Sequence, residues 1–308
     1  MVYGRSEAIL TATAVFLGIS LVAVILRCFV RLRIVKAFGA DDYIMVVAMI
    51  CNLAFGICGM VGSTYGMGKH LAYFAGRPYL YHSAMLCFYL GQIFYVVTAV
   101  LARLSIVMTL LRLFVEPLHI WILYGITALS IVAGLLFFFF TIFQCQPVNY
   151  LWDRMTMEGK CLDMDLLLGI VYMYSVVSAV CDFTIGILPV FIVWKLKMRR
   201  RTKTMVAGIL GIGCLASTAV IVRIPYLHYA RDADFLYQTT EISILSNVEA
   251  SLGITAGCLM TLRPLLRVLR GSSAGTSGEE IGTYYRQETS HGTSGRAMSL
   301  RSIERLYS

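Results

Sequence analysis

The sequence predicts an all-α polytopic membrane protein, a seven-transmembrane helix bundle with its N-terminus outside the cell and its C-terminus inside. The first observation is composition: 58% of the 308 residues are hydrophobic and 14% are charged, whereas soluble domains carry roughly 25% charged residues. The second is a series of long apolar runs, and the third is the placement of Lys and Arg in alternate loops. Because so few charges are available to cover a surface in water, lipid is expected to surround most of the chain.

Seven apolar runs are long enough to cross a membrane, for which a helix needs about 20 residues. These runs cover residues 8–26, 43–61, 84–111, 120–143, 166–194, 205–226 and 242–262. They are continuously apolar rather than alternating, which favours helices over the strands of a barrel. The last residues, 271–308, are rich in Gly, Ser and Thr and have no apolar period. This predicts a membrane domain over residues 1–270, followed by a disordered cytoplasmic tail.

The distribution of basic residues predicts the orientation. Before the tail, fourteen Lys and Arg residues follow the first, third, fifth and seventh runs, against six in the remaining loops. Because short cytoplasmic loops retain Lys and Arg, the fourteen are expected in the cytosol. The residues expected in cytoplasmic loops, facing an effector, are Asp41, Asp42, Arg112, Arg199, Arg200 and Arg201. The basic block after the fifth run is first of all a topological anchor, and contact with anionic lipid or an acidic partner is a second interpretation.

The longest ordered loop on the outer side, residues 144–165, contains two cysteines, Cys145 and Cys161. Both lie on the oxidising face, where a disulfide between them would tie this loop down over the bundle. Cys87, near the outer end of the third run, is a competing partner. The pairing of Cys145 with Cys161 is the one that we favour.

Four ionisable residues fall within the apolar runs: Arg103, Asp182, Arg223 and Glu249. Charges there are costly and usually face the interior of the bundle with a partner. Counting residues from the ends of the runs suggests two pairs, Arg223 with Glu249 and, nearer the cytosol, Arg103 with Asp182. These residues either form structural ion pairs that hold helices together, or line a ligand pocket and switch between two helix arrangements.

Several sequence segments together resemble the fungal rhodopsin-like domain family over about residues 26–269. They include "RCFVRLRIVKAFGADDY", "RLSIVMTLLRLF", "DFTIGILPVFIVWKLKMRRRTK" and "VEASLGITAGCLMTLRPLLRVL". That family includes membrane proteins of satratoxin-type clusters and is related to fungal pathogenicity receptors of the G-protein-coupled kind. The resemblance implies a loop closed by Cys145 and Cys161, and signature polar positions at Asp41, Asp42, Asp182, Arg223 and Glu249. Two residues depart from the family pattern, Arg103 in place of Lys and Met260 in place of Pro.

The sequence argues against two classes of function. A retinal Schiff base needs a lysine amine inside the bundle, and residues 242–262 contain no Lys. An enzyme is not expected, because no HExxH motif occurs. His70, His82 and His228 are scattered and lack the i,i+4 spacing of a zinc site. We therefore expect no cofactor and no metal, and no nucleic-acid partner either, since the basic residues lie beside apolar runs.

A receptor is the function that this pattern favours, with the outer loop and upper helix ends binding a small molecule or a surface cue. Ligand would shift the population between two packings of the bundle. Its partners would be the lipid bilayer, an unknown small-molecule ligand and a cytosolic G protein or other effector. Its expected location is the plasma membrane. The DRY and NPxxY motifs of animal receptors are absent, so G-protein coupling is a hypothesis. The alternative is a transporter or an accessory membrane protein of secondary metabolism.

Overall fold

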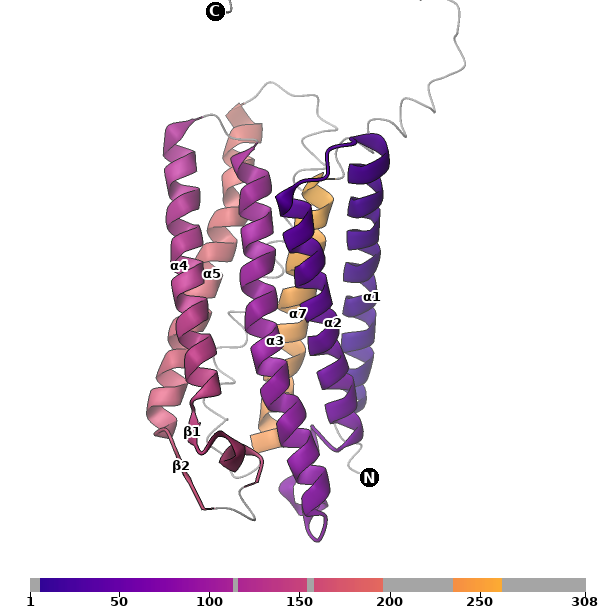
Figure 1. Cartoon of the computed structure of the whole chain (residues 1–308), viewed down its shortest axis with the longest axis vertical. Coiled ribbons are helices and arrows are strands. Elements are labelled where there is room, and N and C mark those ends of the chain that lie inside the picture. The colour runs from indigo at the N-terminus through magenta and orange to yellow at the C-terminus, as the bar shows by residue number, and fades with distance from the viewer. Residues whose placement is uncertain (1–5, 113–115, 154–157, 196–234, 262–308) are drawn as a thin grey trace, which may run out of the picture. The chain divides into compact units, whose positions relative to one another are not determined.

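A computed structural model describes residues 6–112, 116–153, 158–195 and 235–261. Six long helices run roughly alongside one another in this part of the chain (Figure 1). They are α1 (Ser6–Phe29), α2 (Ala40–Thr64), α3 (Pro78–Leu111), α4 (Pro117–Ile142), α5 (Met164–Lys195) and α7 (Phe235–Thr261). A short π-helix, Val30–Ile34, continues α1. Each of the six is long and apolar enough to cross a membrane, which confirms the prediction of an all-α polytopic membrane protein.

Each described helix overlaps one of the predicted apolar runs and extends it at one or both ends. The sixth run, residues 205–226, lies outside the described residues, as does the predicted tail from residue 271. The count of seven spans and the orientation of the two termini therefore stay predictions. The helices exceed the runs because hydropathy marks only the part of a helix that lies in hydrocarbon, while backbone hydrogen bonding continues into the polar region.

Local sequence explains where several of these helices begin. Pro78 and Pro117 occupy the first turns of α3 and α4, where a missing N–H costs nothing and the fixed φ suits a helix. The first turn of α2 carries Asp41 and Asp42, and a carboxylate is stabilised there by the helix dipole. The Asp42 side chain accepts a hydrogen bond from the Gly39 backbone N–H at 3.1 Å, so it also caps the helix.

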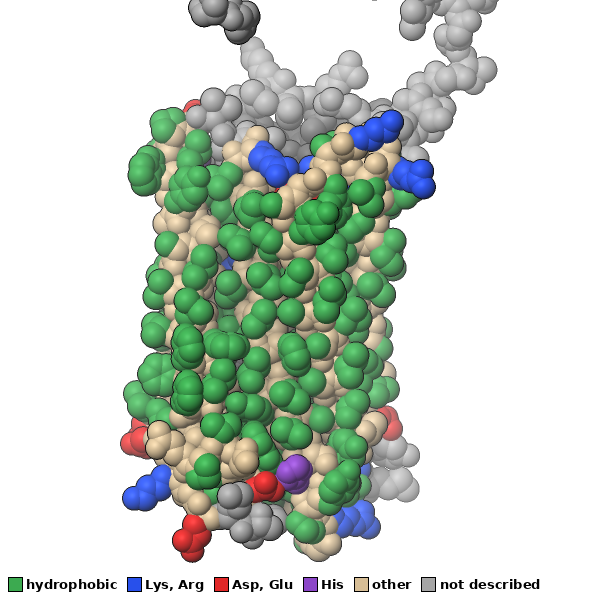
Figure 2. Space-filling view, in the orientation of Figure 1, with side chains coloured by type: hydrophobic (Ala, Val, Ile, Leu, Met, Phe, Trp, Pro, Cys, Tyr) green, Lys and Arg blue, Asp and Glu red, His purple; other side chains and the backbone are tan. Residues whose placement is uncertain are grey.

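The exterior of the bundle is apolar, as a lipid-facing surface should be. Figure 2 shows hydrophobic side chains covering the visible face between two ends where charged side chains gather. Trp121 on α4 is 75% exposed and Val22 on α1 is 65% exposed. A surface covered by such exposed apolar side chains would be unfavourable in water. The polar side chains of Asn52, Thr98 and Ser105 are instead fully buried between helices.

The helices pack closely at small residues. A Cβ added to Gly134 on α4 would lie 2.5 Å from Val100 Cγ2 on α3, so the two helices approach more closely than any larger residue would allow. Gly257 on α7 is similar, because its added Cβ would lie 2.6 Å from Ile106 Cγ1. In this arrangement α1 packs against α2 and α7, and α3 packs against α2, α4 and α7.

The loop between α4 and α5 is closed by a disulfide between Cys145 and Cys161. The two cysteines lie opposite one another in a small antiparallel pair, β1 (Cys145–Gln146) and β2 (Lys160–Cys161). Trp152 from this loop packs on Tyr89 of α3, with the ring centroids 5.3 Å apart. The favoured pairing is thus confirmed, and the competing pairing with Cys87 is wrong, since Cys87 is a free thiol on α3.

Candidate functional site

Three charged side chains meet in the interior of the bundle, one from each of three helices. We call Arg103 on α3, Asp182 on α5 and Glu249 on α7 the Arg103 triad. Arg103 donates two hydrogen bonds to Asp182, from Nε to Oδ1 at 2.8 Å and from Nη2 to Oδ2 at 2.9 Å. Its Nη2 also lies 3.3 Å from Glu249 Oε1. The planar guanidinium suits this two-point contact, which fixes orientation as well as charge.

Neutral side chains complete the hydrogen bonding of the triad. Ser178 Oγ donates to Glu249 Oε1 at 3.0 Å and also contacts Arg103 Nη2. Tyr95 donates its hydroxyl to the other Glu249 oxygen, Oε2, at 2.8 Å. Both oxygens of Glu249 are therefore bonded, as a buried carboxylate requires. Neither Tyr95 nor Ser178 was predicted, because a Tyr or Ser within an apolar run carries no charge signal that sets it apart.

The triad carries one positive and two negative groups when both acids are ionised. These three side chains by themselves then sum to one negative charge; residues outside the described part of the chain are not included in this sum. Asp182 is the most accessible of the three, with 19% of its side chain exposed. It borders a cavity between α3, α5 and α7 with an empty volume of about 570 Å³, open space included, which Arg103 and Glu249 also line.

The expected pair of Arg103 with Asp182 is confirmed. Glu249 also lies within reach of the Arg103 guanidinium, and its predicted pairing with Arg223 stays a prediction. Arg223, the partner that depth suggested for Glu249, lies outside the described residues. Counting residues along a helix gives depth but not direction around the axis, so it could not reveal that one Arg side chain reaches both acids.

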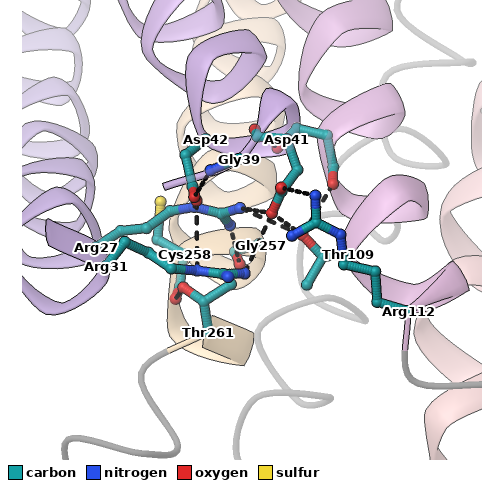
Figure 3. A network of polar contacts seen from close by, with 11 residues as sticks. Arg27, Arg31, Gly39, Asp41, Asp42, Thr109, Arg112, Gly257, Cys258 and Thr261 are labelled. Carbon is teal, nitrogen blue, oxygen red and sulfur yellow. Dashed lines mark hydrogen bonds and ion pairs between the residues drawn. The ribbon is translucent and has the colours of Figure 1, made fainter. Parts of the chain in front are cut away.

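A second polar cluster lies where α1 ends, α2 begins and α3 ends (Figure 3). We call Arg27, Arg31, Asp41, Asp42 and Arg112 the Arg27 network. The guanidinium of Arg27 lies between the two acids, with Nε 2.8 Å from Asp42 Oδ1 and Nη2 3.0 Å from Asp41 Oδ2. Its Nη1 donates to the backbone carbonyl of Gly257 on α7 at 3.1 Å. Arg27 therefore joins three helices.

Two further arginines approach Asp41. Arg31 Nη2 lies 3.1 Å from Asp41 Oδ2, and Arg112 Nη2 lies 2.8 Å from Asp41 Oδ1. Thr109 on α3 donates to Asp41 Oδ2 at 3.2 Å. Of the network, Arg112 is the most exposed, with half of its side chain accessible (51%). The network thus ties the end of α3 to the beginning of α2 by charge.

These positions correct one prediction. Asp41 and Asp42 were expected to face an effector, but both are buried, and Asp41 is 0% exposed. The reason is that Arg27 and Arg31 contact both carboxylates, while Arg112 contacts Asp41. The i,i+4 spacing of Arg27 and Arg31 beside adjacent acids was a usable signal for this network. Arg199, Arg200 and Arg201 lie outside the described residues.

A third polar contact lies between α1, α2 and α7. Asn52 Nδ2 on α2 donates to Ser20 Oγ on α1 at 3.4 Å and to Ser251 Oγ on α7 at 3.3 Å. Asn52, Ser20 and Ser251 are all buried. Such contacts hold helices together in lipid, where apolar surfaces gain little by meeting one another.

The described residues contain no group of three or more His, Cys, Asp or Glu that could hold a metal ion. The triad supplies only two carboxylates, and both are already engaged by Arg103. This arrangement can form and break ion pairs between helices, or exchange a proton.

The six apolar helices in the described part of the chain define it as an integral, multi-pass membrane protein of the all-α class. Residues 26–268 match the Fungal rhodopsin domain, and the chain belongs to this family.

Three relatives are similar to parts of the chain. Fugralins biosynthesis cluster protein 2 of Gibberella zeae is 30% identical over 129 residues, which is 40% of this chain and 30% of the relative. A SAT4 family membrane protein of Emericella nidulans is 29% identical over 59% of this chain and 46% of its own length. Satratoxin biosynthesis SC1 cluster protein 4 of Stachybotrys chartarum is 26% identical over 43% and 46%. The chain therefore spans less than half the length of each.

Proposed function

We propose that this protein is a seven-transmembrane receptor of the plasma membrane, with its N-terminus outside. It senses a small molecule or a surface cue and passes the signal to a cytosolic effector, of which a G protein is one candidate. It is neither an enzyme nor a retinal pigment, and it needs no cofactor. The observation that carries this proposal is the Arg103 triad, because one guanidinium holds acids from two other helices.

The triad is suited to two-state behaviour. Arg103 can satisfy Asp182 and Glu249 together only while α3, α5 and α7 keep their present spacing. A shift of one helix would take a buried carboxylate away from the Arg103 cation, which is costly unless a second arrangement offers another one. Ligand binding that favours the second arrangement would then shift the population, by at most the difference in its affinity for the two.

The same helix joins the triad to the Arg27 network. Arg103 lies on α3 and Arg112 directly follows its last residue, nine positions further on, which is about 13 Å along a helix. A rotation or translation of α3 that alters the contacts of Arg103 also alters the contact of Arg112 with Asp41. Since Arg112 is half exposed at the end of α3, a change there is accessible to a partner in the cytosol.

Recruitment of a Gα subunit tests the proposal. Full-length protein and the variants Asp182→Asn and Glu249→Gln are expressed in fungal cells, and recruitment of each Gα subunit is followed by energy transfer under inducing conditions. We expect recruitment that depends on the inducing condition, with basal recruitment altered at least threefold by either variant. Absence of recruitment of every Gα subunit by a correctly inserted protein would contradict a G-protein-coupled receptor.

A transporter is a second candidate, because the triad is one negative charge in excess and Asp182 borders a cavity. Proteoliposome flux that responds to pH and disappears in Asp182→Asn would favour it over the receptor. The names of two relatives contain the words biosynthesis and cluster. An accessory role in secondary metabolism is therefore a further alternative. Changed metabolite output without any flux or recruitment would favour that role.

A further inference from the structure

A cavity lies between α1, α2, α3 and α7, away from the Arg103 triad but joined to it by one side chain. We call it the Tyr95 cavity. Its empty volume, which includes open space, is about 510 Å³. Tyr95 lines this cavity and also donates to Glu249 Oε2 at 2.8 Å.

The lining is uncharged and mostly apolar. None of the described residues that line it is Asp, Glu, Lys, Arg or His. Phe55 from α2, Phe88 from α3 and Ile9 from α1 form much of the apolar wall. A charged ligand would find no counter-ion among these described residues, so they favour an uncharged molecule with a large apolar part.

Polar groups converge on the cavity from α7. Ser243, Ser246 and Asn247 line it, and their i,i+3 and i,i+4 spacing places them on one face of that helix. Asn247 is only 3% exposed, yet its Oδ1 has no hydrogen-bond partner among the residues that the structure describes. A buried amide oxygen without a donor is rare in proteins. A hydroxyl or N–H of a ligand would supply the missing donor.

The loop between α2 and α3 covers one side of this cavity. Met67 from the loop lines the cavity and is buried. Its backbone carbonyl accepts a hydrogen bond from Ser6 Oγ of α1 at 2.7 Å, and Gly68 N–H donates to the Leu236 carbonyl of α7 at 3.2 Å. The loop is thereby fixed to two of the four helices that form the cavity.

We propose that the Tyr95 cavity binds an uncharged, mainly apolar small molecule through a hydroxyl or amide that donates a hydrogen bond to Asn247 Oδ1. Tyr95 connects this ligand to Glu249 of the Arg103 triad. Binding itself stands on the cavity and on Asn247, whereas the effect of binding on signalling rests on the proposed function.

Glycine 59 offers a direct way to fill the cavity. Gly59 lines it, and a Cβ added there meets only Thr13 Oγ1, at 3.8 Å. The variant Gly59→Leu therefore places its side chain in the cavity without a clash at Cβ. The matched control is Gly18→Leu, because Gly18 is exposed on α1 and has nothing within 4 Å of an added Cβ.

The test uses an octanol that carries a photoreactive diazirine, together with the corresponding octane diazirine without the hydroxyl. Purified full-length protein in lipid nanodiscs is labelled, and the sites are mapped by mass spectrometry. We expect saturable labelling of cavity residues such as Met67 and Phe88, reduced at least tenfold in Gly59→Leu and unchanged in Gly18→Leu. Asn247→Leu should weaken labelling by the alcohol about tenfold and leave labelling by the alkane unchanged.

Other results overturn the proposal. Labelling that does not saturate and spreads over lipid-facing residues such as Trp121 and Val22 would mean partition into the bilayer only. Equal labelling of Gly59→Leu and Gly18→Leu would mean that the cavity is not the site. Since the measurement needs no effector, saturable labelling with no Gα recruitment would preserve this site and contradict the receptor. Recruitment of a Gα subunit that depends on Asp182, without saturable labelling, would support the receptor and contradict the proposed ligand site.

Discussion

Tyr95 on α3 donates its hydroxyl to Glu249 on α7 across 2.8 Å, and the two residues lie 154 positions apart in the sequence. Glu249 in turn lies 3.3 Å from Arg103. One side of Tyr95 faces the cavity and its hydroxyl faces the triad, so this residue is where an apolar ligand site and a buried charge cluster meet. A hydrogen bond to a charged group stabilises more than one between neutral groups.

Replacement of Tyr95 by Phe should therefore loosen Glu249 while leaving the ring packing in place. The Tyr95 ring packs on Phe55 and Tyr174, and Phe preserves these contacts. We expect a loss of about 1–3 kcal/mol of unfolding free energy, the usual effect of removing one partner of a buried charged group. Thermal unfolding in detergent measures it. Phe55→Leu is the control, because it alters the same ring cluster but not the hydrogen bond. By itself, Phe55→Leu is expected to lower the free energy of unfolding by more than Tyr95→Phe does. An unchanged free energy of unfolding in Tyr95→Phe would contradict the role assigned to the Tyr95 hydroxyl.

Removal of Arg103 should be among the most damaging changes in the bundle. Arg103→Met keeps most of the volume but leaves Asp182 and Glu249 without their shared cation, which costs about 3–5 kcal/mol. Arg103→Lys should cost less, because the charge stays and only the two-point contact is lost. Unfolding of both variants in detergent is the measurement.

The triple variant Arg103→Met, Asp182→Asn, Glu249→Gln distinguishes charge from packing. It leaves no buried charge in the triad, so part of the stability lost in Arg103→Met should return. If the triple variant were less stable than the unmodified protein by the sum of the three separate single-variant losses, the three residues would not form one energetic unit.

Hydropathy predicts the helices because every span must be apolar to lie in lipid, and the residues of each run meet this requirement by themselves. The contacts of the charged side chains are not local. Arg27 bonds the carbonyl of Gly257, 230 residues away, and only the folded bundle brings them together. Intramembrane charge marked Arg103, Asp182 and Glu249 as candidates, but the direction in which each points around its helix carried no such signal. Asn247 was missed because a single Asn in an apolar run has no distinguishing pattern.

Gly39 is expected to be a sensitive position for the Arg27 network. A Cβ added there would lie 2.6 Å from Arg112 Nη2 and 2.6 Å from Asp41 Oδ1. Its φ of −116° is accessible to any residue, so Gly39→Ala tests crowding rather than backbone strain. We expect Arg112 to move away from Asp41 and to react at least twofold faster with phenylglyoxal, an arginine reagent. Gly125→Ala, at an exposed position with nothing within 4 Å, should leave the rate unchanged; an unchanged rate in Gly39→Ala as well would contradict the crowding argument.

The disulfide should stabilise the loop between α4 and α5. Cys145 and Cys161 are separated by 16 residues, and opening a loop of that length costs about 3 kcal/mol in the chain-entropy description. Cys145→Ser should lower the thermal midpoint and expose the loop to limited proteolysis between the two positions. Cys87→Ser is the control, since Cys87 is free. Faster cleavage in Cys87→Ser than in Cys145→Ser would contradict the assigned pairing.

The orientation of the bundle can be tested through the same loop. Because disulfides persist in oxidising compartments, the Cys145–Cys161 loop is expected on the outer side, opposite the Arg27 network. Seven crossings would then put the N-terminus outside and the C-terminus in the cytosol, as the excess of Lys and Arg also predicts. In intact protoplasts, an antibody should reach an N-terminal epitope tag without permeabilisation and a C-terminal tag only after it, and a membrane-impermeant phosphine should reduce the disulfide. Access to both tags from the same side would require an even number of crossings, and the cytosolic assignment of Arg112, on which the signalling proposal depends, would then lose its basis.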